Sequence, residues 1–249
     1  MRIALIGTGN LATHLVKAFE KSNDIDCVQW VGRKTTPHLE LSRTPYFTQF
    51  QKSIDTDVCL VAVSDDQITH VAHQLKDIDI LVAHTAGAIS TNALEPIIRK
   101  GVFYPLQSFL QNTIVNWDDI PICIEATNRS DEHLLKTLAN SLSKQVHTIT
   151  QSQRLHLHAA AVFANNFCNH LLGISQNLTE KSGLPFAILE PLIRETFERS
   201  FSQSTLSVQT GPAKRNDLKT QDKHLALLSE KEVELYRSLS QTIFNTHNT

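Results

Sequence analysis

The segment between Arg154 and Asn169 carries polar side chains at a spacing that could support acid–base chemistry. If this segment is a helix turning about 100° per residue, Arg154, Asn165 and Asn169 all fall within about 40° of His158. An imidazole titrates near neutral pH, so His158 is the candidate general acid or base, and Asn165 and Asn166 are candidates to orient a substrate. The alternative is a core histidine whose polar neighbours are satisfied by adjacent helices. A ligand cavity is the interpretation we carry forward, with Asn169 as a substrate contact.

A glycine-rich string near the N-terminus, GTGNLA, has the composition of a phosphate-binding turn. It lies between an apolar, strand-like run and a helical pattern, which is the context such a turn requires. Gly7 permits a tight turn, Gly9 lets backbone N–H groups approach a pyrophosphate, and Ala12 allows close packing of helix on strand. The predicted dinucleotide contacts are Gly7, Thr8, Gly9, Asn10 and Leu11. An ordinary structural turn is the alternative.

The end of the second predicted strand, VQWVGRKTT, indicates which dinucleotide to expect. A site that prefers NAD places Asp or Glu here to hold the ribose 2′-OH, and this string has neither. Arg33 and Lys34 instead offer cations to a 2′-phosphate, which a guanidinium matches well. We therefore expect NADP, although a solvated basic loop would leave the same residues.

Polar residues follow three further predicted strands, at the sheet edge where ligands bind in open α/β folds. Ser64 follows one strand, and Thr85 and Gly87 follow the next; all three are expected to contact the cofactor. Ser64 has the simpler alternative of capping the next helix, and Gly87 that of a plain turn. Gln107, in the string YPLQSF, is a candidate substrate contact.

The order of the elements predicts how these residues are positioned. Up to about residue 150, short β-branched runs alternate with amphipathic patterns, as in a sheet of parallel strands covered by helices. Strands are expected at residues 2–6, 27–31, 58–63, 80–84, 102–104, 122–125 and 145–148, and helices at 10–21, 66–76, 91–99 and 131–143. Beyond residue 151 the strand patterns stop, and helices are expected at 155–178, 185–202 and 218–244. The predicted fold is α/β: an N-terminal Rossmann-type doubly wound sheet (1–150) followed by an all-helical domain for substrate binding and dimerisation (151–249).

Composition excludes several classes of protein. The chain has 249 residues, 41% hydrophobic content and a formal net charge of −2, with no run of Lys or Arg. These values are typical of a globular protein that binds neither nucleic acid nor a membrane. The apolar run at residues 3–6 is strand-sized and follows no charged leader, so we expect a cytoplasmic protein.

The sequence does not predict a metal site. His156 and His158 lie two residues apart and therefore project to opposite sides of a helix. The four cysteines are far apart and are expected to be buried, reduced thiols: Cys27, Cys59, Cys123 and Cys168.

Taken together, the strings ALIGTGNLA, HTAG, YPLQSF, RLHLHAAAVFANNFCNHL and TGPAKRND, which are spread over nearly the entire length of the chain, carry a family resemblance. The chain resembles the Rossmann-like proteins with a DUF2520-type C-terminal domain, within the group that includes 6-phosphogluconate dehydrogenase and pyrroline-5-carboxylate reductase. The resemblance implies an NADP-binding domain, a helical domain that often dimerises, and a cleft between them. In better-understood relatives the first long helix of the second domain presents a catalytic Lys with an Asn one turn later. This chain departs from that pattern, because it has no Lys there and offers His158 and Asn165 instead.

Three functions remain open. The first is an oxidoreductase that transfers hydride between NADP(H) and a small carbonyl, imine or hydroxy compound. The second is a sensor or regulatory protein that binds NADP(H) without catalysis, which the missing Lys favours. The third is a protein that binds another phosphorylated ligand and does no redox chemistry.

The apolar helices of residues 151–249 and the string TGPAKRND within that range predict an assembly. We expect a homodimer built from residues 151–249, because three apolar helices expose more surface than so small a domain can bury alone. Asp217 is expected to cap the helix that follows it. Arg215 is expected to reach the stripe of His158 and Asn165 in its own or the partner subunit, and the alternative for it is a surface salt bridge.

Overall fold

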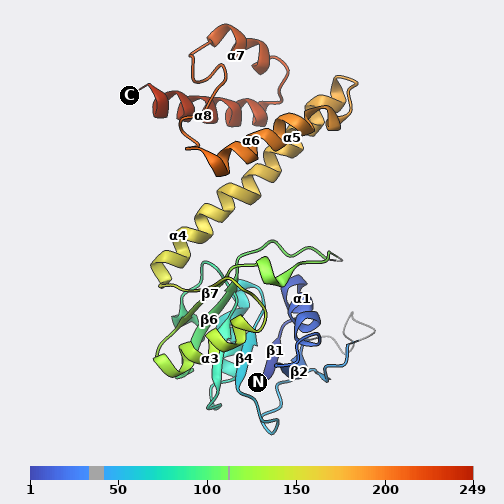
Figure 1. Cartoon of the computed structure of the whole chain (residues 1–249), viewed down its shortest axis with the longest axis vertical. Coiled ribbons are helices and arrows are strands. Elements are labelled where there is room, and N and C mark those ends of the chain that lie inside the picture. The colour runs from blue at the N-terminus through green and yellow to red at the C-terminus, as the bar shows by residue number, and fades with distance from the viewer. Residues whose placement is uncertain (34–41, 112, 249) are drawn as a thin grey trace. The chain divides into compact units, whose positions relative to one another are not determined.

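The computed structural model describes residues 1–33, 42–111 and 113–248, so Lys34 lies outside the described residues. The chain forms two compact units, Met1–Cys168 and Asn169–Thr249 (Figure 1). The boundary predicted at residue 150 separates a nucleotide-binding part from a part for substrate binding and dimerisation, and this division of function remains a proposal. No helix in the described ranges combines the length and apolarity needed to cross a membrane.

The first unit is built on one eight-stranded sheet in the order β3-β2-β1-β4-β5-β6-β7-β8. The strands are β1 (Arg2–Ile6), β2 (Asp26–Val31), β3 (Tyr46–Phe47), β4 (Val58–Val61), β5 (Leu81–His84), β6 (Lys100–Pro105), β7 (Ile122–Ala126) and β8 (Val146–Thr148). The chain adds strands outward from β1 and then returns to add β4 on the other side, which confirms the doubly wound α/β prediction. The two-residue strand β3 was not predicted.

The expectation of a parallel sheet is wrong at one junction, because β7 pairs with β6 in the antiparallel sense. A parallel return requires a long crossover connection, usually a helix. Within the described residues of the β6–β7 connection, the helical element is one turn of 3₁₀-helix, η3 (Trp117–Asp119). The chain therefore comes back antiparallel, and β8 then pairs parallel with β7.

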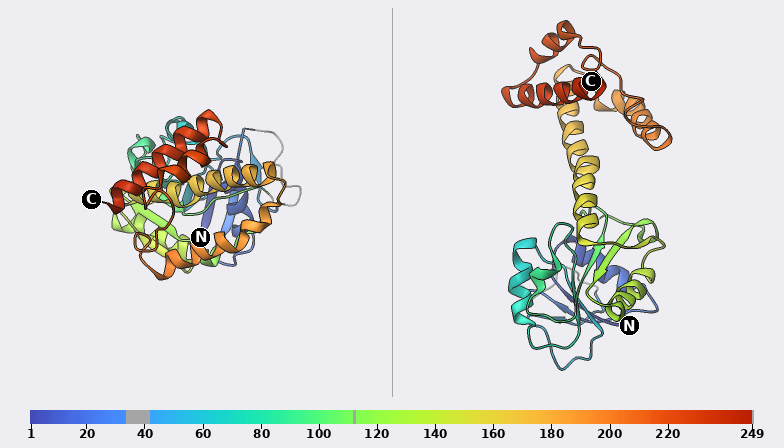
Figure 2. Two further views of the ribbon diagram at one scale, coloured as in Figure 1. Left: turned by 90° about the horizontal axis from the view of Figure 1, so that it is seen from above. Right: turned by 90° about the vertical axis from the view of Figure 1, so that its left-hand side faces the viewer.

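Helices cover both faces of the sheet (Figure 2). The helices α1 (Asn10–Phe19) and α3 (Arg129–Asn140) contribute to one apolar cluster, and α2 (Ile68–Gln74) and the 3₁₀-helix η2 (Thr91–Leu94) to the other. A second 3₁₀ turn, η1 (Asp65–Gln67), leads into α2. The predicted helix at 91–99 is wrong beyond Leu94, since Glu95 takes extended backbone angles, as a residue before proline prefers.

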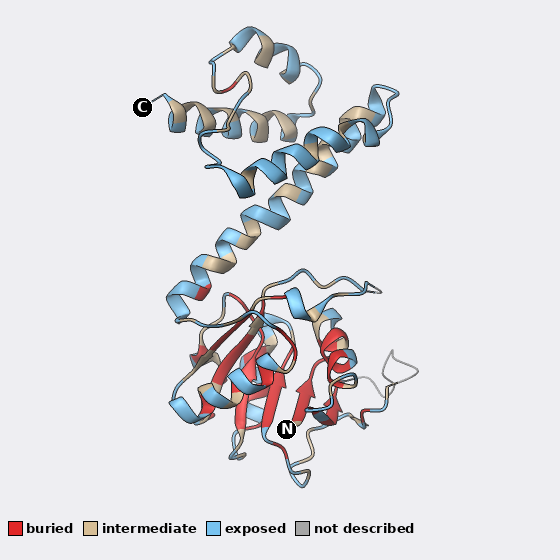
Figure 3. Cartoon of the chain, viewed as in Figure 1, coloured by how far each residue is buried: buried red, intermediate tan, exposed pale blue. Residues whose placement is uncertain are grey.

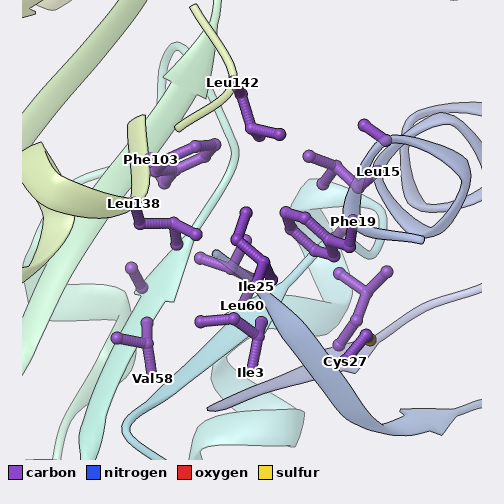
Figure 4. Close-up of a cluster of buried hydrophobic side chains, with 14 of the residues drawn as sticks. Ile3, Leu15, Phe19, Ile25, Cys27, Val58, Leu60, Phe103, Leu138 and Leu142 are labelled. Atoms are coloured by element: carbon purple, nitrogen blue, oxygen red, sulfur yellow. The ribbon is translucent and has the colours of Figure 1, made fainter. Parts of the chain in front are cut away.

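The core lies between the sheet and these helices (Figures 3 and 4). Leu15 and Phe19 of α1 pack with Ile3 and Leu60 from the neighbouring strands β1 and β4. This packing holds α1 against the carboxyl end of β1, so that the glycine turn between them has a rigid support on each side.

A long helix leads out of the sheet and contains an irregular turn. The helix α4 (Gln151–Ala161) begins at a capping box made by Thr150 and Gln153, continues through a π-helical turn labelled η4 (Val162–Phe167), and becomes α5 (Cys168–Lys181). A π-helix forms i→i+5 hydrogen bonds, so the 100° rotation assumed for the sequence does not apply across it. The predicted stripe is therefore corrected: the side chains after the π-turn do not keep the α-helical register with those before it.

The second unit is helical throughout its described residues, with η5 (Phe186–Leu189), α6 (Glu190–Ser202), α7 (Leu218–Leu225) and α8 (Glu230–His247). Asp217 caps α7 as predicted, accepting a hydrogen bond from the Thr220 N–H at 3.1 Å. The expected single helix at 218–244 is wrong, because Ser229 and Glu232 form a new capping box that starts α8.

Three of the four thiols agree with the prediction. Cys27, Cys59 and Cys123 are buried and unpaired, and Cys168 is only half-buried, because it lies where the π-turn meets α5 rather than in the sheet.

Candidate functional site

A cavity of about 840 Å³ in the first unit lies at the carboxyl ends of β1, β2, β4 and β5. This is the point where the strand order reverses, and ligands of open α/β sheets bind at such a point. Its walls include these predicted cofactor contacts: Gly7, Thr8, Gly9, Asn10, Leu11, Arg33, Ser64 and Thr85. The walls also include residues that were not predicted: Gly32, Thr48, Gln49, Phe50, Lys52, Gln67, His70 and Gln74. Gly87 is not among the wall residues.

Gly7 is required by the turn itself. It has a φ of 127°, and a Cβ at this position would lie 2.0 Å from the carbonyl oxygen of Ala62. Its N–H donates to the Val31 carbonyl at 2.8 Å, and the Trp30 indole N–H donates to its carbonyl at 2.6 Å. Two hydrogen bonds from β2 and the close approach of Ala62, the residue after β4, therefore hold the turn in one position.

Gly9 has a different role, because protein packing does not require a glycine there. It precedes α1 with a φ of −75°, and a Cβ at this position would meet no atom within 4 Å. The first N–H groups of α1, which follow Gly9, have no partners inside the helix and favour an anion. The turn and the cavity fit the pyrophosphate of a dinucleotide.

The side chain of Asn10 is engaged elsewhere. Its amide donates to the Phe109 carbonyl at 3.0 Å, and the imidazole of His14 donates from Nε2 to the Leu110 carbonyl at 2.9 Å. The side chains of Asn10 and His14 thus fasten the β6–β7 connection onto α1, beside the glycine turn. Sequence reasoning missed His14, since a histidine on a helix gives no local signal of a distant loop.

Positive charge lies on one wall of the cavity. Arg33 is exposed on this wall. The pKa of the nearby Asp66 carboxyl is lowered mainly by a hydrogen bond from the Ser64 hydroxyl, next by one from Gln67, and only weakly by the charge of Arg33. Lys52 adds a second cation to the wall. It was missed because it follows β3, far along the chain from the glycine turn.

Ser64 and Thr85 take the positions expected at the ends of β4 and β5. Ser64 stands at the N-cap position of η1, but its side chain makes no hydrogen bond to the helix backbone. Ser64 therefore has the place of a helix cap without the capping hydrogen bond. Thr85 is buried, and its N–H donates to the Val61 carbonyl at 3.2 Å.

A second cluster surrounds His158 on α4. The hydroxyl of Tyr104, at the end of β6, lies 3.1 Å from His158 Nδ1. Gly87 packs against both rings, because a Cβ there would lie 2.5 Å from His158 Nδ1 and 2.8 Å from Tyr104 Cζ. Burial is the main cause that raises the pKa of the Tyr104 phenol, so its neutral form is favoured. Sequence reasoning missed Tyr104, although it lies in the string YPLQSF.

Arg154 holds this cluster in place. Its side chain is 1% exposed and donates to the carbonyls of Ala86, Gly87 and Ile89 at 3.2, 2.9 and 2.7 Å. It also pairs with Glu125 of β7 at 3.1 Å. Arg154 is therefore a structural clamp between α4 and the loop that carries Gly87, and it does not face a cavity as the predicted stripe required.

His84 is a fully buried histidine beneath the same loop. Its Nδ1 accepts from the Ala86 N–H at 3.2 Å, and its Nε2 has no hydrogen-bond partner among the described residues. Burial first, and the charge of Arg154 second, lower the pKa of His84 from 6.5 to about 4, against a weaker backbone interaction with Ser90. His84 is therefore neutral at physiological pH.

The remaining predicted residues lie apart from these two clusters or in the other unit. Asn165 and Asn166 are exposed on the π-turn. Gln107 is exposed, and its side-chain oxygen accepts from the Ser108 N–H at 2.8 Å. Asn169 and Arg215 belong to the second unit and are exposed there. No group of three or more His, Cys, Asp or Glu side chains in the described ranges is placed to hold a metal ion.

Comparison with known proteins places this geometry in context. The family described as "Domain of unknown function (DUF2520)" matches residues 120–243. The crystal structure of a "putative NADP oxidoreductase" from Bacteroides fragilis is 33% identical, with a TM-score of 0.85 and 98% of each chain covered. A protein from Thermotoga maritima is 21% identical, with a TM-score of 0.68 over 98% of each chain. The pyrroline carboxylate reductase of Plasmodium falciparum, solved with NADP bound, is 14% identical with a TM-score of 0.62 over 98% of each chain. A search of curated proteins finds no match.

Proposed function

This chain belongs to the DUF2520 family, and from that premise we propose that it is an NADP-dependent oxidoreductase acting on a small carbonyl, imine or hydroxy compound. The observation that carries the proposal is the cavity of about 840 Å³ at the strand-order reversal, bordered by the glycine turn and the N-terminus of α1. When bound, NADP(H) supplies or accepts the hydride.

The residues of the first unit divide the work of binding. The backbone of the turn from Gly7 to Leu11 and the free N–H groups of α1 would hold the pyrophosphate. Arg33 would hold the 2′-phosphate, because no carboxylate stands at the end of β2 to favour NAD. Ser64, Thr85 and Gly87 remain predicted cofactor contacts, and so does Lys34.

His158 is the proposed general acid or base. Its imidazole is only half-buried, and the hydrogen bond between its Nδ1 and the Tyr104 hydroxyl leaves Nε2 without a partner among the described residues. Asn165 and Asn166 are proposed to orient the substrate, with Gln107, Asn169 and Arg215 as further contacts. The support for His158 is that Gly87 and Tyr104 hold one edge of its ring and leave the other available.

Calorimetry and a substrate panel test this function together. We expect NADPH to bind, and we expect one or more carbonyl or imine compounds to drive its oxidation. His158→Gln should then lower kcat by roughly 100-fold or more while NADPH affinity is kept.

His156→Gln is the matched control, since His156 is exposed on the same helix and its Nδ1 contacts only the Ser152 carbonyl, at 2.7 Å. Normal turnover by His158→Gln would remove the acid–base role. Binding of NADPH without turnover on any compound would favour the non-catalytic sensor, and failure to bind either dinucleotide would reject the cofactor itself.

We also propose that the protein is a homodimer joined through the second unit. Of its described residues, Ala213 alone is buried, although the unit presents ten large apolar side chains to solvent: Leu171, Leu184, Ile188, Leu192, Phe197, Phe201, Leu206, Leu218, Leu227 and Leu239. A unit of this size without its own core requires a partner surface. A second copy of the chain supplies a matching set of apolar helices. The four unpaired cysteines are compatible with the proposed cytoplasmic location.

A further inference from the structure

The contact between Tyr104 and His158 also bears on which nitrogen of the imidazole carries the proton. Three elements meet at it: β6 supplies Tyr104, the loop after β5 supplies Gly87, and α4 supplies His158. The rings of Tyr104 and His158 are 6.0 Å apart and inclined at 67°, so the hydroxyl points at one ring nitrogen while the ring faces do not stack.

The placement of the hydrogens follows from the hydrogen-bond inventory. A neutral imidazole has one N–H and one bare nitrogen, and a phenol can donate one proton. Within the described chain, the Tyr104 hydroxyl has one hydrogen-bond partner, His158 Nδ1 at 3.1 Å. If Nδ1 carried the imidazole proton, it would donate to the phenol oxygen, and the phenol proton of this half-buried residue would lack an acceptor in the protein. A donor without an acceptor disfavours that arrangement.

We propose that Tyr104 is a positioning residue that holds neutral His158 as the Nε2–H tautomer, so that the site presents a hydrogen-bond donor to its ligand. The phenol donates to Nδ1, and the imidazole proton stays on Nε2, on the opposite edge of the ring. Tyr104 keeps its own proton throughout, in agreement with the raised pKa of its phenol.

The chemical class of the ligand follows from this tautomer. An Nε2–H donor binds a group with a lone pair and no proton to give, such as a carbonyl oxygen or an imine nitrogen. An alcohol proton would instead require a bare Nε2 as its acceptor. This inference rests on the proposed function and refines it: the form of the substrate that neutral His158 receives is the carbonyl or imine, which is the form that is reduced.

The tautomer can be measured directly on the full-length protein without any substrate. The probe is ¹⁵N-histidine labelling with long-range ¹H–¹⁵N correlation spectra at about pH 8, where an ordinary imidazole is neutral. The His158 signals are assigned by their loss in His158→Gln. We expect the Nδ1 shift of a bare nitrogen and the Nε2 shift of a protonated one, and Tyr104→Phe should move both toward intermediate values.

A second tyrosine–histidine pair in the chain provides the control. Tyr236 lies 2.8 Å from His224 Nδ1 in the second unit, so Tyr236→Phe should change the His224 signals and leave those of His158 unaltered. A protonated Nδ1 on His158 in the wild-type protein would overturn the proposal, and this reading requires only the folded His158→Gln variant that assigns the signals. Unchanged His158 signals in folded Tyr104→Phe would overturn it as well. Neither result depends on NADPH turnover, so failure of this inference is separate from failure of the proposed function.

Discussion

At the scale of single residues, three polar side chains hold the loop beside His158: Arg154, Glu125 and His84. Arg154 donates hydrogen bonds to three loop carbonyls and forms an ion pair with Glu125. His84 accepts a hydrogen bond from the Ala86 N–H. Each is buried or nearly so, and buried polar groups generally require hydrogen-bond partners. Nε2 of His84 is the exception among them, since it has no partner within the described residues. The loop that carries Gly87 is therefore held by hydrogen bonds in addition to the apolar packing of Ala86 and Ile89.

His84 is expected to make the protein sensitive to acid. Its pKa is about 4 in the folded chain and 6.5 as the ordinary value, so the unfolded state binds more protons between these limits. The stabilising contribution of His84 is complete above pH 6.5 and declines as the pH falls toward about 4, by up to about 3 kcal/mol in total. Urea unfolding from pH 7.5 to 4.5 measures this decline, and His84→Gln should flatten it.

The exposed His133 provides the reference, since His133→Gln should retain the wild-type slope. Equal slopes for wild type and His84→Gln would show that His84 is not responsible for the acid sensitivity.

Arg33 is expected to determine the preference for NADPH over NADH. A charge-assisted contact to the 2′-phosphate contributes about 1.5–3 kcal/mol, so Arg33→Ala should reduce the ratio of the two affinities by roughly tenfold or more. Titration calorimetry with both nucleotides measures the ratio. Arg43→Ala removes an equal charge from an exposed residue that does not line the cavity, and it should leave the ratio unchanged. An unaltered ratio in Arg33→Ala would mean that the arginine is merely solvated.

At the scale of elements, the loop after β5 and the first turns of α4 act as one piece. The loop carbonyls accept from Arg154, and Gly87 leaves room for the His158 and Tyr104 rings. The π-turn then follows, and such turns occur often at functional sites. The local order of this junction determines the position of the proposed acid–base group.

Gly87→Ala is expected to disrupt that junction. The added methyl would lie 2.5 Å from His158 Nδ1, so the imidazole must move away from Tyr104. Overpacking of this kind costs about 1–3 kcal/mol. We expect a lower Tm, altered His158 nitrogen shifts and a loss of turnover, because the displaced imidazole is the proposed acid–base group.

Gly173→Ala on α5 is the matched substitution, since its Cβ would meet no atom within 4 Å. It should preserve turnover and raise helix stability by up to about 1 kcal/mol. Wild-type turnover and His158 shifts in Gly87→Ala would contradict the packing described at this junction.

At the scale of the whole molecule, the two units differ in how they are stabilised. The first has two continuous apolar clusters around its sheet, and the described part of the second has Ala213 as its one buried residue. The second unit therefore depends on contacts beyond its own helices, and the proposed homodimer supplies them.

The dimer predicts a dependence on concentration. Light scattering at micromolar concentration should give twice the 27.9 kDa of one chain, and the midpoint of urea unfolding should rise with protein concentration. Phe201→Ser, at a side chain 88% exposed in the second unit, should weaken the association. Ile98→Ser, at an equally exposed side chain in the first unit, should leave it unaltered. A monomeric mass with a constant midpoint would reject the dimer.

Much of the fold was predictable because it depends on short-range patterns. Seven of the eight strands were expected, since β-branched runs between turn residues are local signals, and β3 was missed because two residues form no pattern. The pairing of β7 and the end of the 91–99 helix depended on a missing crossover helix and on one proline. Eight of the 22 cavity-wall residues were predicted, namely the glycine turn with Arg33, Ser64 and Thr85, whereas Lys52 and His70 lie in segments that were not expected to reach the cavity.

The sequence by itself determined the doubly wound sheet, the glycine turn at its strand-order reversal and the helical character of the C-terminal region. These features follow from periodicity and from the backbone freedom of Gly7, which neighbouring residues along the chain reveal. Only the tertiary structure decided that Arg154 clamps a loop, that Tyr104 reaches His158, and that Asn10 holds a distant connection. These pairings join residues 50 or more positions apart, so they depend on how the elements pack, and no local pattern encodes that packing.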